Sequence, residues 1–308
     1  MGEALLDHAT RSIEVGSKSF ATASKLFDVH TRRSAVMLYA WCRHCDDVID
    51  GQEAGFGQQA GDRSDSETRL ASLLASTRQV YRGEPMADPA FAALQTVVTA
   101  HQIPERFPLE HIEGFAMDVE DRTYQTLDDT LQYCYHVAGV VGVMMAMVMG
   151  ARDNATLDRA CDLGLAFQLT NIARDIIEDA QIGRCYLPME WLNEQNIPRA
   201  AMADPQYRDA LAVLAARLVE TAEPYYDSAQ VGLGALPLRS AWAIATARGV
   251  YREIGVKVKA LGRSAWDARV STSKADKVRL LAGAAGTALA SRGASAEPRS
   301  DALWQRPR

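Results

Sequence analysis

Helix-forming residues fill almost the whole of this sequence. Long segments are built from Ala, Leu, Arg, Glu and Gln, and runs that alternate β-branched and polar residues, as half-buried strands do, are missing. The sequence therefore predicts an all-α protein. The expected helices cover about 4–15, 18–27, 31–50, 67–82, 88–102, 108–121, 127–150, 154–180, 204–230, 238–261 and 273–291.

Linker and helix-capping signals indicate how the chain divides into domains. Nothing marks a clean linker, so we expect residues 1–292 to form a single domain. Capping boxes are expected at Ser64 and Ser273, where Ser precedes an acid by three residues, and Asp128 and Asp129 after Thr126 suit the N-terminus of a helix. Residues 293–308 begin Gly-Ala-Ser-Ala-Glu-Pro and are expected to form a disordered tail.

Composition limits the function classes. With 308 residues, 48% of them hydrophobic, the chain has the balance of a globular protein. A net charge of −6 gives no general electrostatic footprint for nucleic acid. Five cysteines, an odd count, do not suggest a disulfide framework, and Glu3 and Asp7 stand where a signal peptide would be apolar. We therefore expect a cytoplasmic protein.

The most apolar stretch runs from Val137 to Ala151. It is shorter than the roughly 18–20 residues that span a bilayer. We interpret it as a buried core helix. Gly139 and Gly142 within it suit either room for a ligand or close helix packing, and the sequence leaves both open.

Two clusters of carboxylates are the most informative residues. The first contains Asp46 and Asp50, and the second contains Asp175 and Asp179. Residues four apart lie on one face of a helix, so each pair projects together, although like charges at this spacing destabilise the helix. Mg²⁺ would compensate, because it prefers oxygen ligands and takes one or two carboxylates together with substrate phosphates. The alternative is a solvated acidic face at a helix end.

The residues around the two carboxylate clusters favour a binding site over a solvated acidic face. Hydrophobic residues are interleaved with the acids, as in helices packed on several sides, and buried carboxylates need partners. Arg43, Arg174 and Arg184 accompany the clusters and could bind phosphate bidentately. Ion pairs with the neighbouring carboxylates are an equally good reading of these arginines.

At this point the motifs resemble the squalene/phytoene synthase family. The resemblance covers most of the chain, and the two acidic motifs in their contexts, Tyr39–Asp50 and Gln168–Asp179, carry most of it. The other matching segments are Ser17–Ala21, Tyr133–Gly142, Gly183–Pro188, Leu236–Ser240 and Arg269–Ser273. Together these motifs are specific, although each alone is not.

The resemblance implies the isoprenoid-synthase fold, a set of helices around a central cavity. It implies the phytoene-forming reaction, a head-to-head condensation of two geranylgeranyl diphosphates through prephytoene diphosphate. Two diphosphates would be released with Mg²⁺ or Mn²⁺ as cofactor and without NADPH. The lipophilic substrate suggests peripheral association with a membrane surface, and downstream carotenoid enzymes are possible partners.

The resemblance also assigns residues. Principal metal ligands would be Asp46, Asp50, Asp175 and Asp179, with Asn171 beside them and with Asp47 and Glu178 secondary. Diphosphate contacts would be Arg43, Arg174, Arg184, Arg269 and Lys277. The remaining residues would line the site or shape its reacting end: Gln168, Asn171, Ser19, Phe20, Tyr39 and Tyr251.

Several alternatives remain open. Dehydrosqualene or squalene synthases share these motifs but use farnesyl diphosphate, and squalene synthase also needs NADPH. The one dinucleotide-like pattern, Gly55–Ala60, follows no strand. Asp46-Asp47-x-x-Asp50 also matches chain-elongating prenyl transferases and terpene cyclases. A different class, an inert helical lipid-binding scaffold, would have no need of all four aspartates. Chain length, the preferred metal, double-bond geometry and oligomeric state are not determined by the sequence.

Overall fold

The computed structural model describes residues 5–6, 9–11, 13, 23–51, 63–293 and 297–308. These residues form helices and connecting turns with no strand, which confirms the all-α prediction. The main helices are α3 (Val29–Asp50), α4 (Arg63–Tyr81), α5 (Pro89–His101), α6 (Arg106–Val119), α7 (Leu127–Cys134), η1 (Tyr135–Gly139), α8 (Val140–Val148), α9 (Asn154–Gln181), α10 (Met189–Glu194), α11 (Arg208–Gly232), α12 (Leu238–Leu261) and α13 (Lys274–Ala290).

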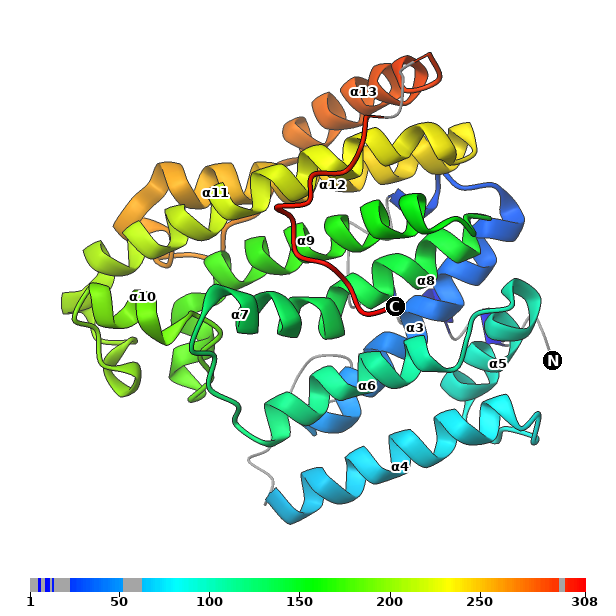
Figure 1. Cartoon of the computed structure of the whole chain (residues 1–308), viewed down its shortest axis with the longest axis horizontal. Coiled ribbons are helices and arrows are strands. Elements are labelled where there is room, and N and C mark those ends of the chain that lie inside the picture. The colour runs from blue at the N-terminus through cyan, green and yellow to red at the C-terminus, as the bar shows by residue number, and fades with distance from the viewer. Residues whose placement is uncertain (1–4, 7–8, 12, 14–22, 52–62, 294–296) are drawn as a thin grey trace.

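Helix α9 is the centre of the assembly. It is 28 residues long and packs against α8, η1, α11 and α12. In Figure 1, α13 lies at the top edge and α4 at the bottom edge, with α9 between them. Helices α3, α5 and α6 pack on the α8 side, so the chain surrounds α9 with helices whose apolar faces form one continuous core.

Capping chemistry fixes where several helices begin. Ser273 and Asp276 exchange the reciprocal bonds of a capping box at α13, as predicted. Thr126 and Asp129 form a second box at α7, where the sequence predicted only a helix N-terminus. The box predicted at Ser64 is wrong, because α4 already begins at Arg63 and Ser64 lies inside its first turn. Short α10 was not predicted, since its six residues carry too little periodic pattern.

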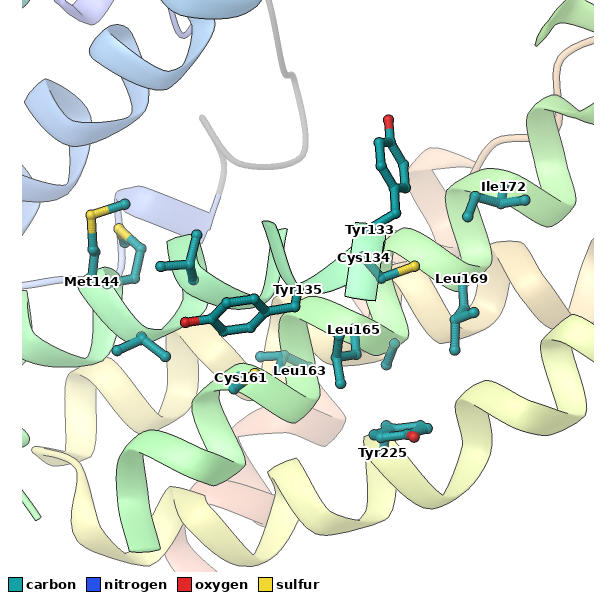
Figure 2. Close-up of a cluster of buried hydrophobic side chains, with 14 of the residues drawn as sticks. Tyr133, Cys134, Tyr135, Met144, Cys161, Leu163, Leu165, Leu169, Ile172 and Tyr225 are labelled. Atoms are coloured by element: carbon teal, nitrogen blue, oxygen red, sulfur yellow. The ribbon is translucent and has the colours of Figure 1, made fainter. Parts of the chain in front are cut away.

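The apolar segment is a core element, as expected. Residues Leu127–Val148 are long and apolar enough to cross a membrane by length and composition, but 72% of the most apolar window is buried inside the protein. The segment comprises α7, the π-helical turn η1 and α8. Its burial against α9 (Figure 2) accounts for its composition without a bilayer.

Glycines bring this segment close to α9. A Cβ at Gly142 would lie 2.3 Å from the carbonyl oxygen of Ala160, and one at Gly164 would lie 2.3 Å from that of Ala138. Close packing is therefore the reason for glycine at position 142. The backbones approach so nearly that no side chain larger than hydrogen fits between them.

The last residues differ from the sequence-based expectation. Segment 297–308 was expected to be disordered, but its side chains pack against the helices. Leu303 and Arg306 are buried, and Arg299 forms an ion pair with Asp162, a fully buried residue of α9. Composition suggested a flexible tail, whereas long-range ion pairs hold it.

The contrast between Gly164 and Gly283 provides a test of the packing. In Gly164→Ala the new methyl meets backbone, so we expect a loss of about 1–3 kcal/mol or more in the free energy of unfolding. Gly283 on α13 has open space around it, so Gly283→Ala should stabilise the helix by up to about 1 kcal/mol. Urea denaturation followed by circular dichroism measures both. Equal stability of the two variants would contradict close packing at Gly164.

Candidate active site

A cavity lies beside α9 between the surrounding helices. At one end it is lined by charged and polar residues, among them Arg43, Asp46, Gln168 and Asn171. The rest of its wall is mostly apolar and comes from α3, η1, α8, α9, α11 and α12. This division suits a ligand with an anionic head and a long hydrocarbon body.

The first acidic cluster is neutralised from within its own helix. Arg43 forms ion pairs with Asp46 at 2.7 Å and with Asp47 at 2.6 Å, one turn along α3. The pKa of Asp46 is raised to about 6, chiefly by burial; the charge of Arg43 opposes the rise, and the charge of Asp50 on the next turn adds to it. The carboxylates therefore lie in a setting where another positive charge would be favourable.

The second cluster lies on α9. Arg174 pairs with Asp175 at 2.5 Å, and Arg269, from the segment between α12 and α13, contacts both Asp175 and Glu178. Asp179 forms no ion pair within the described part of the chain. Burial, with the charge of Asp175 second, raises the pKa of Asp179 to about 7. This end of α9 thus holds one carboxylate whose charge is poorly compensated.

Arg184 joins the two clusters. It follows the turn at Gly183, which has φ of +81° and ends α9, and its guanidinium donates to Asp50 at 2.6 Å. A residue beyond α9 therefore pairs with the last residue of α3. The charge of Arg184 also opposes the rise that burial causes in the pKa of Asp179, so the ends of the two carboxylate motifs, far apart in the sequence, lie near one another.

The other predicted residues divide into three groups. Tyr39 and Tyr251 line the cavity, and Tyr251 stacks on Phe167 with ring centroids 4.1 Å apart. The amide of Asn171 donates to Gln168 at 3.3 Å, on the same wall. Several predicted residues do not line the cavity itself: Asp50, Arg174, Asp175, Asp179, Arg269 and Lys277. All but Lys277 belong to the two carboxylate motifs or pair with them, whereas Lys277 lies on α13. Ser19 and Phe20, like the Gly55–Ala60 pattern, lie outside the described residues.

A second polar group was missed by the sequence analysis. Asp118 on α6 accepts hydrogen bonds from Tyr133 at 3.2 Å and from Tyr186 at 3.0 Å, and the two rings stack. All three residues line the cavity, and burial raises the pKa of Asp118 to about 6. Both tyrosines stand inside motifs that the sequence analysis had noted, but a lone aspartate on α6 gave no signal.

The site fits a divalent cation only together with a ligand. Among the residues that the structure describes, no three His, Cys, Asp or Glu side chains are grouped closely enough to hold a metal ion. The donors are nevertheless carboxylate and amide oxygens, which suit Mg²⁺ or Mn²⁺. The raised pKa values of Asp46 and Asp179 show where added positive charge would be stabilised. Phosphate oxygens would complete the coordination.

Comparison with known proteins agrees with this geometry. The sequence profile described as squalene/phytoene synthase matches residues 13–276. The chain is 64% identical to a 15-cis-phytoene synthase of Enterobacter agglomerans, over 96% of this chain and all of that protein. It is 61% identical to a 15-cis-phytoene synthase of Pantoea ananas, over 98% of both chains.

Solved structures show the same fold. A dehydrosqualene synthase crystallised with a ligand superposes with a TM-score of 0.83 at 27% identity, covering 94% of this chain and 98% of that one. A squalene synthase from Alicyclobacillus acidocaldarius superposes with a TM-score of 0.74 at 24% identity, covering 85% and 95%. The expected isoprenoid-synthase fold is thereby confirmed.

The position of Arg184 predicts a role in anion binding. Arg184→Ala removes a charge that faces the cavity, so we expect the affinity for inorganic pyrophosphate with Mg²⁺ to fall about tenfold or more. Isothermal titration calorimetry measures this. Arg199→Ala is the matched control, because Arg199 pairs with Asp121 away from the cavity. Equal affinities in the two variants would exclude Arg184 from the anion site.

Proposed function

This chain belongs to the squalene/phytoene synthase family, and we propose that it is a phytoene synthase that joins two geranylgeranyl diphosphates head to head. It is a prenyl-transferring enzyme. One diphosphate leaves as the cyclopropyl intermediate, prephytoene diphosphate, forms. The second leaves when that intermediate ionises, rearranges and loses a proton to give phytoene. Identity above 60% over nearly the whole chain to two curated phytoene synthases is the observation that carries this proposal.

The polar end of the cavity is suited to diphosphate departure. Arg43, Arg174, Arg184 and Arg269 surround the two carboxylate motifs and can shift from these carboxylates to a diphosphate when it binds. Mg²⁺ or Mn²⁺, held by Asp46, Asp50, Asn171, Asp175 and Asp179 together with substrate oxygens, would neutralise charge on the leaving group. Both effects lower the barrier to ionisation because they stabilise charge as it develops.

The remainder of the cavity protects the cation. Residues such as Val137, Val141 and Met145 line it with hydrocarbon and exclude water, which would otherwise capture the carbocation. The stacked rings of Phe167 and Tyr251 lie beside the polar end and offer aromatic faces to positive charge. Tyr39 adds a third ring in the same wall.

Farnesyl diphosphate is the competing substrate. The structural neighbour at TM-score 0.83 is a dehydrosqualene synthase, so the fold alone does not favour one chain length. We propose incubating the purified chain with Mg²⁺ and either diphosphate, without NADPH, and analysing hexane extracts by mass spectrometry. A forty-carbon hydrocarbon from geranylgeranyl diphosphate is the expected product. A thirty-carbon product from farnesyl diphosphate, with none from the longer substrate, would overturn the substrate assignment.

The carboxylates are expected to be essential for chemistry and not for folding. Asp50→Ala and Asp175→Ala should each lower turnover by about a hundredfold or more, since each removes an anchor for positive charge at the leaving group. Their helical circular dichroism should stay near that of the parent chain. Glu220→Ala, which breaks an exposed pair with Lys259, is the control and should keep full activity. Collapse of the fold in both aspartate variants would instead indicate a structural role.

We also propose that the protein associates peripherally with membranes in the cytoplasm. The support is chemical: both the prenyl substrate and the hydrocarbon product partition into lipid. Co-sedimentation with phosphatidylglycerol vesicles should recover a larger fraction of the protein than sedimentation without lipid. Identical recovery, with activity unaffected by lipid or detergent, would contradict this proposal.

A further inference from the structure

An arginine, Arg159, lines the part of the cavity that lies far along α9 from the polar end. Along α9 the cavity wall runs from Asn171 at the polar end to Arg159 and Thr156 at the other. Twelve helical residues separate Asn171 from Arg159, which corresponds to about 18 Å along the axis. This depth is of the order of an extended chain of four isoprene units. Arg159 is only 7% exposed, so it belongs to the interior.

Arg159 also borders a second cavity. That cavity lies between α11 and segment 297–308, and its wall includes Tyr225, Ser228 and Trp304 as well as Arg159. Arg159 lines both spaces and therefore lies between them. Gly232 packs against its stem: a Cβ there would lie 3.0 Å from the Cβ of Arg159. The partition is therefore closely fitted.

Hydrogen bonds to backbone hold the guanidinium in place. Its Nη1 donates to the carbonyl oxygen of Ser228 at 3.0 Å, and its Nη2 donates to the carbonyl oxygen of Glu297. One acceptor thus comes from α11 and the other from segment 297–308. Displacing the side chain would leave a buried charge without these partners, which is strongly unfavourable.

Segment 297–308 is itself firmly anchored to α9. Arg299 donates two hydrogen bonds to Asp162, which is 0% exposed and also accepts a bond from the hydroxyl of Ser228. Arg306 pairs with Asp158 at 2.6 Å. In Figure 1 this segment, drawn in red, crosses the helices toward α8. The acceptor that it offers to Arg159 is therefore fixed in position.

We propose that Arg159, held by segment 297–308, is the floor of the prenyl-chain cavity and limits the length of substrate that the enzyme accepts. The inference rests on the proposed function and names a specificity determinant for it. A chain one isoprene unit longer must displace a satisfied buried guanidinium, whereas a chain that ends before it contacts only apolar wall. The floor acts on substrate length and not on the chemistry at the opposite end.

The first test is a competition among diphosphates of fifteen, twenty and twenty-five carbons at equal concentration, with Mg²⁺ and product analysis by mass spectrometry. Arg159→Ala joins the two cavities, so condensation of the twenty-five-carbon substrate should rise about tenfold or more relative to that of the twenty-carbon substrate. An unchanged product ratio in a variant that keeps its helical spectrum and melting temperature would overturn the proposal.

A second variant loosens the floor without touching Arg159. Asp162→Asn combined with Arg299→Met removes both charges of the buried pair, so neither is left unpaired, and weakens the anchoring of segment 297–308 beside Arg159. We expect the same shift toward longer substrates. Arg308→Ala is the matched control, since its pair with Asp158 is exposed on the Arg308 side and Arg306 still holds that carboxylate. If Arg159→Ala does not fold, this double variant decides, and parental selectivity in it overturns the proposal.

The unsubstituted chain separates this inference from the proposed function. Should it make only a thirty-carbon product, the assignment of geranylgeranyl diphosphate fails. The floor is then tested by whether Arg159→Ala raises use of the twenty-five-carbon substrate relative to both shorter ones, because the depth to Arg159 excludes only chains longer than twenty carbons. An unchanged ratio there would overturn the floor as well.

Discussion

Neutralisation of buried carboxylates by adjacent arginines is the interaction on which the site depends. Asp50 ends α3, Asp175 lies near the end of α9, and arginines from three different elements contact them. Without these cations, packing the two helices with acids facing one another would be opposed by both desolvation and repulsion. Arg184 pairs with Asp50 of the first motif and also lies near Asp179 of the second. Its positive charge therefore stabilises both motifs and remains available to a bound anion.

The helical framework could be predicted from the sequence because its signals are local. Periodic apolar residues and the capping boxes at Thr126 and Ser273 each act within a few residues. Segment 297–308 could not be predicted in this way. Arg299 and Arg306 bind acids on α9 that lie more than a hundred residues earlier in the sequence, and composition carries no record of such pairs. The role of Asp118 could not be predicted for the same reason. Its partners are Tyr133 on α7 and Tyr186 in the loop after α9, and both are distant from it in the sequence.

For the site, the sequence predicted which residues share a helix face better than it predicted what each residue binds. The i,i+4 rule placed Asp46 with Asp50 and Asp175 with Asp179. Arg43, Arg174 and Arg184 were noted beside these motifs, and the resemblance added Arg269 and Lys277. The sequence left open whether those arginines pair with carboxylates or contact diphosphate. In the structure they pair with carboxylates, as the short distances from Arg43 and Arg174 show. The two interpretations are compatible, because a guanidinium has more donors than one carboxylate can accept.

The two ends of the cavity use arginine in opposite ways. Arg43 and Arg184 pair with carboxylates that are partly compensated and that face the open polar end, so an incoming anion can share them. Arg159 donates to backbone carbonyl groups and packs against Gly232, so moving its side chain would break hydrogen bonds that a hydrocarbon ligand cannot replace. Between them, the glycine-mediated contact of η1 and α8 with α9 keeps the apolar wall close-packed and fixes the distance from one end to the other. The distance between the anion-binding end and Arg159 is therefore fixed by close packing, and in our proposal this distance sets the length of prenyl chain that the cavity accepts.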